Sequence, residues 1–314
     1  TPTVQREALV AAFNGVLGDH LEATANPLAI HMSFRHKGHA LNLQPGLPLP
    51  ADLKVSDRLL VAVHGSCMND LQWERRGHSH VRALADEFGY SPLYLHYNSG
   101  RHISTNGREF AGLLETLLRD WPGGVRELVI VGHSMGGLVA RSACHQALQM
   151  HMAWPATLTK MFFLGSPHGG APLEKAGNLF ERALGISRYS APLISLGQIR
   201  SAGITDLRHG SLLDSDWNTA NRFERVFRHR HAVPLPPGIA CHVVAAVSGK
   251  NPGLHENIVG DGLVPLRSAL GLDDDPLRDL GIPKERQAVF YGTGHLELLD
   301  RPEVFDQLRC WLAC

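Results

Sequence analysis

The stretch ELVIVGHSMGGLVAR, residues 127–141, breaks a short apolar run with a serine between glycines and then resumes with helical spacing. A serine at a tight strand-to-helix corner is forced out of the regular backbone pattern. Small residues two places to either side let neighbouring backbone approach without a Cβ clash. Ser134 is therefore a candidate nucleophile. The pattern alone is weak in a chain with 32 glycines, so its context has to decide.

Six nearly continuous apolar runs predict buried strands at 58–65, 91–98, 127–134, 160–167, 241–249 and 287–295. Strands without polar alternation are covered on both faces, which is typical of a parallel sheet. Between the second and third runs, apolar residues at helical spacing predict a core-facing helix over 110–121. We therefore predict an α/β fold with a doubly wound, mostly parallel sheet, whose functional site lies off the carboxyl ends of the strands.

Two segments lie outside this repeat. Residues 1–57 hold a loose helical stripe over 3–20, a strand-like stretch over 29–38 and a Pro-rich connector, and we expect them to pack on the core. Roughly 70 residues, 171–240, separate the fourth and fifth strands, which is too long for an ordinary connection. Their apolar spacing predicts an inserted helical cap. The core would then comprise residues 58–170 and 241–314.

Composition excludes several classes of protein. Thirty basic residues balance thirty acidic ones, so no net field favours nucleic acid or an anionic membrane. No run is long and apolar enough to cross a bilayer, and the first 25 residues lack a signal-peptide pattern. Five cysteines without dense spacing predict no disulfide framework, and Cys310 and Cys314 are expected to be buried thiols. We therefore expect a cytoplasmic protein without an integral membrane segment or a nucleic-acid partner.

A serine nucleophile needs an imidazole to take its proton and a carboxylate to hold that imidazole in the useful tautomer. Asp261 follows the fifth strand in IVGDGLVPL, and His295 follows the sixth in FYGTGHLEL. Both lie at strand ends, so they can converge with Ser134 on one rim of the sheet. The competing aspartates 273–275 are interpreted as a solvated turn, and the 214 and 216 pair as part of the cap.

These motifs resemble the α/β-hydrolase family of serine esterases and lipases over roughly residues 58–312. The matching features are G-H-S-M-G-G at the corner, V-H-G at 63–65, D-G-x-V-P at 261–265 and G-H-x-E at 294–297. HYNSGRHISTNGREF and LGSPHGG are similar to bacterial lipase-like proteins related to the GPI inositol-deacylase group. The resemblance implies Ser134 as nucleophile, Asp261 as acid and His295 as base.

The same resemblance implies an oxyanion hole formed by two backbone amides. One is the amide of Met135, the residue after the nucleophile. The other belongs to the loop after the first core strand and is assigned to Ser66, with Cys67 beside it as a possible substitute.

Other chemistry has little support in the sequence. His78 and His80 are two apart and would not share a helix face, and the chain has neither C-x-x-C nor H-E-x-x-H. It also lacks a glycine-rich phosphate loop, so we expect no metal and no cofactor. Ser166 and His168 form a second Ser/His pair, which we interpret as a turn leading into the cap.

The sequence thus predicts a serine hydrolase that cleaves small-molecule or lipid-like carboxylic esters through an acyl-enzyme intermediate. An acyltransferase or a thioesterase would use the same triad, and a catalytically silent binding protein could keep the same fold. Apolar residues of the cap, Leu193 and Ile194 among them, are expected either to line the acyl pocket or to pack on the domain.

Overall fold

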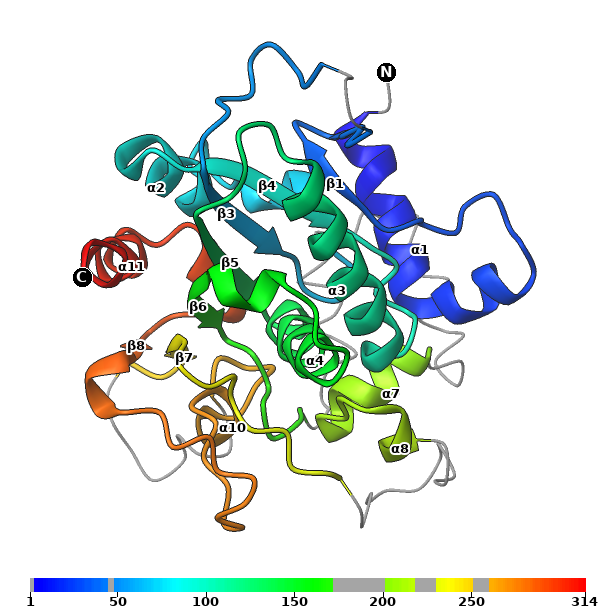
Figure 1. The fold of residues 1–314 in the computed structure, drawn as a ribbon. Helices are drawn as coiled ribbons and strands as arrows, with labels where there is room; N and C mark the ends of the chain where they lie inside the picture. The colour runs from blue at the N-terminus through cyan, green and yellow to red at the C-terminus, as the bar shows by residue number, and fades with distance from the viewer. Residues whose placement is uncertain (1–2, 45–47, 172–200, 218–229, 251–259) are drawn as a thin grey trace.

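The computed structural model describes residues 3–44, 48–171, 201–217, 230–250 and 260–314. Within these residues the strands form one sheet in the order β2-β1-β4-β3-β5-β6-β7-β8 (Figure 1). Neighbouring strands from β4 to β8 pair in parallel, whereas β1 pairs antiparallel with β4, and β2 with β1. The prediction of a mostly parallel sheet is confirmed.

The six predicted strands correspond to six parallel strands of the sheet. They are β3 (Arg58–Val63), β4 (Ser91–His96), β5 (Glu127–His133), β6 (Leu158–Leu164), β7 (Ala240–Val247) and β8 (Gln287–Tyr291). β1 (Ser33–His36) lies within the stretch predicted as a strand, and it forms an edge hairpin with β2 (His39–Ala40), which lies just beyond that stretch. Each core strand ends earlier than predicted, because the glycine and polar residues at its end already belong to the turn.

Helices cover both faces of the sheet, as the doubly wound prediction requires (Figure 1). α3 (Ile103–Asp120) and α4 (Met135–Gln149) pack on one face, and α2 (His80–Phe88) and α11 (Pro302–Ala313) on the other. Alternate side chains of β3 enter the two cores: Leu59 and Val61 face one, Leu60 and Ala62 the other. Among the described residues, no helix is long and apolar enough to cross a bilayer.

The helix predicted over 110–121 is the C-terminal part of α3, which begins earlier, at Ile103. Short elements fill the connections. They are η1 (Asp70–Trp73), η2 (Trp154–Thr157), α10 (Leu266–Ala269), η4 (Lys284–Arg286) and η5 (His295–Leu299). η5 begins at the candidate base, directly after the turn that follows β8.

The N-terminal helix α1 (Val4–Ala23) packs on loops at the carboxyl edge of the sheet. The Asn98 side-chain amide donates to the Gly18 carbonyl at 2.9 Å, and the Ser201 hydroxyl donates to the Gly15 carbonyl at 2.7 Å. The contact is close: a Cβ built on Gly15 would lie 1.9 Å from Cys67 Sγ. α1 therefore supports the loop after β3 directly.

Two helices are described within the interval 171–240, α7 (Ala202–His209) and α8 (Asp214–Trp217). Asp206 of α7 accepts the Ile103 amide at 2.9 Å, and Trp217 stacks on His102 with ring centroids 3.7 Å apart. These contacts tie the interval to the start of α3. The boundaries of a cap stay a prediction, and Leu193 and Ile194 lie outside the described residues.

All five cysteines are free thiols. The expectation that Cys310 and Cys314 are buried is wrong, because both are exposed. α11 buries Val304, Leu308, Trp311 and Leu312. Cys310 lies on the opposite side of the helix, and Cys314 caps its end, so spacing alone could not identify the buried face.

His242 on β7 makes stability depend on pH. It is 5% exposed and packs between Phe162 and Trp311, at ring-centroid distances of 5.1 and 4.8 Å. Burial lowers the pKa of His242 to about 4. In the unfolded chain a histidine takes up a proton near pH ~6.5, so between pH ~6.5 and about 4 the unfolded state binds more protons than the folded state. Stability is therefore fully present above about pH 6.5 and falls as the pH drops towards 4.

Replacing His242 by Phe should flatten this profile. The difference in free energy of unfolding between pH 7.5 and pH 4 should shrink by on the order of 2 kcal/mol, because one titrating group is lost. Urea denaturation across this range measures it. His39→Phe, at an exposed histidine of β2, serves as control and should keep the wild-type profile. If the His242→Phe variant kept the wild-type dependence of stability on pH, the pKa of His242 would not be lowered in the folded state.

Candidate active site

Ser134 occupies the corner between β5 and α4. Its φ of 54° and ψ of −124° lie outside the conformations that L residues favour. Two backbone hydrogen bonds hold the corner: the Ser134 amide donates to the Leu164 carbonyl at 2.9 Å, and the Gly137 amide donates to the Ser134 carbonyl at 3.1 Å. The serine is thus fixed by β6 on one side and by the first turn of α4 on the other.

The glycines two places to either side of Ser134 permit this geometry. A Cβ on Gly136 would lie 2.0 Å from the Val63 carbonyl oxygen, and one on Gly132 would lie 2.6 Å from the Gly137 Cα. Neither distance is possible for a real side chain. The sequence predicts that glycine is needed at both positions because neighbouring backbone approaches closely there, and these distances agree with that reason.

Asp261 and His295 form a buried pair. Asp261 Oδ2 lies 2.6 Å from His295 Nδ1, and both side chains are almost completely buried. The other carboxylate oxygen, Oδ1, accepts the amides of Leu263 at 2.9 Å and Val264 at 2.8 Å. The carboxylate is therefore fixed by its own loop, and it binds one nitrogen of the ring while leaving Nε2 for another partner.

His133, which directly precedes Ser134, packs against His295. Their ring centroids are 4.8 Å apart, and His133 Nε2 donates to the His295 carbonyl at 3.3 Å. Burial and the neighbouring His295 lower the pKa of His133 well below its usual range, so the His133 ring is neutral. The sequence motif predicted no role for His133, which holds the backbone of the candidate base.

The loop after β3 approaches the same corner. The Cys67 amide donates to the Ser99 hydroxyl at 3.0 Å, and Cys67 has a left-handed φ of 60°. Because its amide is already engaged, Cys67 is a poor substitute for Ser66 as an oxyanion donor. Ser99 was missed in the sequence, although it lies in the polar stretch directly after β4.

One pocket, with a volume of about 50 Å³, brings most of these residues together. Ser134, His295, Ser66 and Cys67 line it on the polar side. Gly65, His133 and seven apolar residues complete the lining; the apolar ones are Met68, Pro167, Ala171, Leu207, Leu263, Val264 and Leu296. Met135, the first residue of α4, is fully buried directly after Ser134, where helix amides have no carbonyl partner within the helix.

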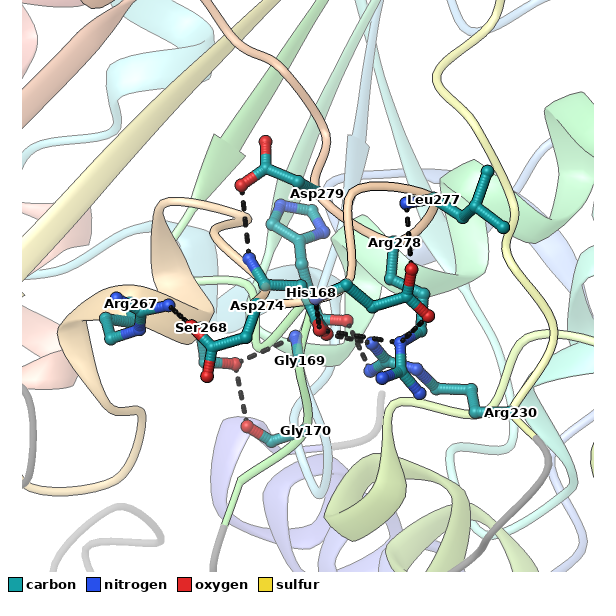
Figure 2. A network of polar contacts seen from close by, with 12 residues as sticks. His168, Gly169, Gly170, Arg230, Arg267, Ser268, Asp274, Leu277, Arg278 and Asp279 are labelled. Atoms are coloured by element: carbon teal, nitrogen blue, oxygen red, sulfur yellow. Dashed lines mark hydrogen bonds and ion pairs between the residues drawn. The ribbon is translucent and has the colours of Figure 1, made fainter.

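A larger cavity of about 610 Å³ adjoins this pocket, and both include Ala171. Its walls are polar, with Arg267 paired to Asp274 and Ser268 bonded to the backbone of Gly169 and Gly170 (Figure 2). None of the candidate triad residues lines it, so the smaller pocket is the candidate site.

The remaining histidine motifs have other partners. His78 Nε2 lies 2.8 Å from His80 Nδ1, so these two rings bond to each other. His168 bonds through Nδ1 to Arg141 and not to Ser166 Oγ, which is buried and has no hydrogen-bond partner in the described part of the chain. In the part of the chain that the structure describes, no three His, Cys, Asp or Glu side chains are placed to share a metal ion.

Comparison with known families gives one match. The model of the PGAP1-like alpha/beta domain family matches residues 57–234, which is more than half of the chain. The matched region begins just before β3 and includes Ser134 and the loop that carries Ser66. Asp261 and His295 lie beyond its end. No curated protein matches the chain.

Solved structures show the fold. A lipase from Bacillus licheniformis in its mature form has a TM-score of 0.52 at 15% identity and covers 90% of this chain and 98% of its own. A lipase-esterase related protein from Clostridium acetobutylicum matches with a TM-score of 0.45 at 12% identity, covering 90% and 99%. An esterase from Pyrococcus furiosus has a TM-score of 0.45 at 14% identity, with 82% of each chain covered. The sheet and the Bacillus lipase together identify the α/β-hydrolase fold.

The contact between α1 and the loop after β3 can be tested by overpacking. Gly15→Ala should destabilise the protein by about 1–3 kcal/mol, because the new Cβ would lie 1.9 Å from Cys67 Sγ. Adding Cys67→Gly removes that sulfur and suits the left-handed φ, so the double variant should recover part of the loss. Chemical denaturation measures both.

Gly112→Ala is the matched control, because Gly112 lies in α3 with open space around it, and it should stabilise slightly. A double variant no more stable than Gly15→Ala alone would show that the sulfur is not what the added methyl group meets.

Proposed function

The chain belongs to the PGAP1-like alpha/beta domain family, and we propose that it is a serine hydrolase that cleaves carboxylic esters through an acyl-enzyme intermediate. One observation carries this proposal: Asp261 holds His295 Nδ1 at 2.6 Å, and His295 lines the same pocket as the strained Ser134. A nucleophile, a base and an orienting carboxylate in one pocket are what acyl transfer requires.

In the proposed reaction, His295 Nε2 takes the proton of the Ser134 hydroxyl while Oγ attacks the ester carbonyl carbon. Asp261 holds the ring in the tautomer with its proton on Nδ1 and stabilises the imidazolium that forms. The imidazolium then gives its proton to the leaving alcohol, and the acyl group stays on Ser134. A water molecule, deprotonated by the same nitrogen, releases the acid and restores the serine.

Two backbone amides are proposed to stabilise the oxyanion. Met135 is the first residue of α4, where the helix dipole favours negative charge. Ser66 is proposed as the second donor, and Cys67 is not, because the Cys67 amide already donates to Ser99. Both donors belong to a rigid frame, since Ser134 is bonded to Leu164 and the Ser66 loop rests on α1.

The acyl group is proposed to occupy the apolar side of the pocket. Leu207 of α7 and Ala171 contribute to this side, so part of the interval 171–240 lies next to Ser134. This contact supports a cap over residues 171–240 on a core of 58–170 and 241–314. Leu193 and Ile194 remain proposed as further lining residues of the acyl pocket.

Replacing Ser134 by Ala tests the nucleophile. Hydrolysis of p-nitrophenyl butyrate should fall by on the order of 10⁴-fold, and labelling by a fluorophosphonate probe should disappear. Thermal stability should stay close to wild type, because the side chain faces the pocket.

Ser215→Ala, at an exposed serine of α8, is the control and should retain both activity and labelling. A wild-type protein that neither hydrolyses esters nor accepts the probe would instead be a silent binding protein. Hydrolysis that survives in Ser134→Ala would assign the nucleophile to another residue.

The acyl pocket predicts a dependence on chain length. Each buried methylene adds up to ~0.8 kcal/mol, so kcat/KM should rise from acetate to butyrate esters until the pocket is full. Leu207→Asn, of similar size but polar, should lower kcat/KM for butyrate several-fold more than for acetate. Leu277→Asn, at a side chain that is 78% exposed, should change neither. Equal losses for both esters would place Leu207 outside the acyl site.

A further inference from the structure

Arg141 is a buried guanidinium with no acidic partner among the described residues. It is 4% exposed and lies on α4, two turns after Ser134. Nη1 donates to His168 Nδ1 at 3.2 Å, Nη2 donates to the Val233 carbonyl, and Nε has no partner. Burial lowers the pKa of Arg141 to about 10, so the group still carries its charge at neutral pH. An uncompensated buried charge is costly, which calls for a counter-ion.

His168 adds a second buried donor. Because Nδ1 accepts from Arg141, the proton of the neutral ring lies on Nε2. Burial and the neighbouring Arg141 lower the pKa of His168 well below its usual range, so the ring stays neutral. Nε2 is buried and has no hydrogen-bond partner among the described residues. Arg141 and His168 thus each hold an unused N–H group.

Two further guanidinium groups surround the same histidine. Arg230 Nη1 donates to the His168 carbonyl at 3.0 Å, and Arg230 and Arg278 both pair with Asp273, at 2.9 and 3.4 Å. Figure 2 shows the two arginines lying together beside His168. Asp273 is therefore shared by two arginines, and Arg278 also pairs with Asp275 at 3.4 Å. Arg141 has no carboxylate partner among the described residues.

A cavity of about 10 Å³ lies among these groups, which is room for one small species. Arg141, His168, Arg230, His231 and Arg278 line it, and the other lining residues are glycine or apolar. Among the described residues that line the cavity, none is acidic. Asp216 bonds to His231 and Asp273 pairs with Arg230, and neither aspartate is among the described residues that line the cavity.

We propose that this cavity binds one small monovalent anion, with chloride as the ligand class that fits. A water molecule would need acceptors for its two protons, whereas these side chains offer N–H donors and positive charge. A monatomic anion needs less room than phosphate or other oxyanions, so the small volume favours chloride over them. The anion would join α4 to residues 210–212 and 230–233, independently of the proposed hydrolysis.

The first test compares melting temperatures in sodium chloride and sodium gluconate at equal ionic strength. A ligand that binds only the folded state raises the melting temperature with saturation, and a rise of about 3 °C is expected for chloride over gluconate. Gluconate is too large for the cavity. Identical melting temperatures in the two salts would overturn the proposal.

Variants then locate the effect. Arg141→Met should lose the chloride increment, whereas Arg126→Met, at an exposed arginine that pairs with Asp57, should keep it in full. A chloride increment that persists in Arg141→Met would place the binding elsewhere and also overturn the proposal.

A direct measurement covers the case in which Arg141→Met does not fold. Crystals of the wild-type protein grown in sodium bromide should show an anomalous peak inside the cavity at the bromine edge. An empty cavity would refute the site, and a peak without any halide-dependent rise in melting temperature would indicate an adventitious ion only. Neither measurement depends on ester hydrolysis. A protein that binds bromide but does not hydrolyse esters would therefore contradict the proposed function and leave the anion site standing.

Discussion

The first turn of α4 lies so close to β3 that only glycine fits at position 136. A Cβ there would lie 2.0 Å from the Val63 carbonyl, and a Cβ on Gly65 would lie 3.0 Å from that of Ser134. This packing fixes the nucleophile candidate against the loop that follows β3. The unusual backbone of Ser134 costs on the order of 1–3 kcal/mol, which burial of α4 in the core offsets. Any side chain at 136 would move α4 outward and separate Ser134 from the Ser66 loop.

The loop after β3 leaves the sheet and therefore needs support from elsewhere. Ser99 accepts its Cys67 amide, and Gly15 of α1 packs against the Cys67 sulfur. α1 lies before residue 57, where the family match begins. In this chain, α1 lies outside the matched region and supports the loop after β3, which lies inside it. Ser201, the N-cap residue of α7, adds to this contact by donating a hydrogen bond to the Gly15 carbonyl.

Hydrophobic patterning predicted the sheet because its parallel strands are buried on both faces and appear as unbroken apolar runs. The same runs singled out Ser134, Asp261 and His295 as candidates, since each was predicted to lie past a strand end. Patterning found only part of the buried face of α1: Ala11 and Ala12 belong to the predicted stripe, whereas Asn14, Gly15, Gly18 and Leu21 do not. Its first apolar residue, Val4, is 62% exposed. Ser99 and Cys67 are 32 positions apart, and only the folded chain shows that they meet.

Hydrogen-bond partners, more than burial, distinguish the histidines around Ser134. Burial lowers the pKa of His64 to about 4, and its ring donates to the Gly65 carbonyl at 2.9 Å. His133 likewise donates to a carbonyl, that of His295. Neutral imidazoles suit strand ends, where backbone groups leave the ladder and need a polar partner without an added charge. His295 is equally buried, but its Nδ1 faces the Asp261 carboxylate. A carboxylate can orient the ring with its proton on Nδ1 and leave Nε2 free, which is why His295, and not His64 or His133, is the ring proposed as the base.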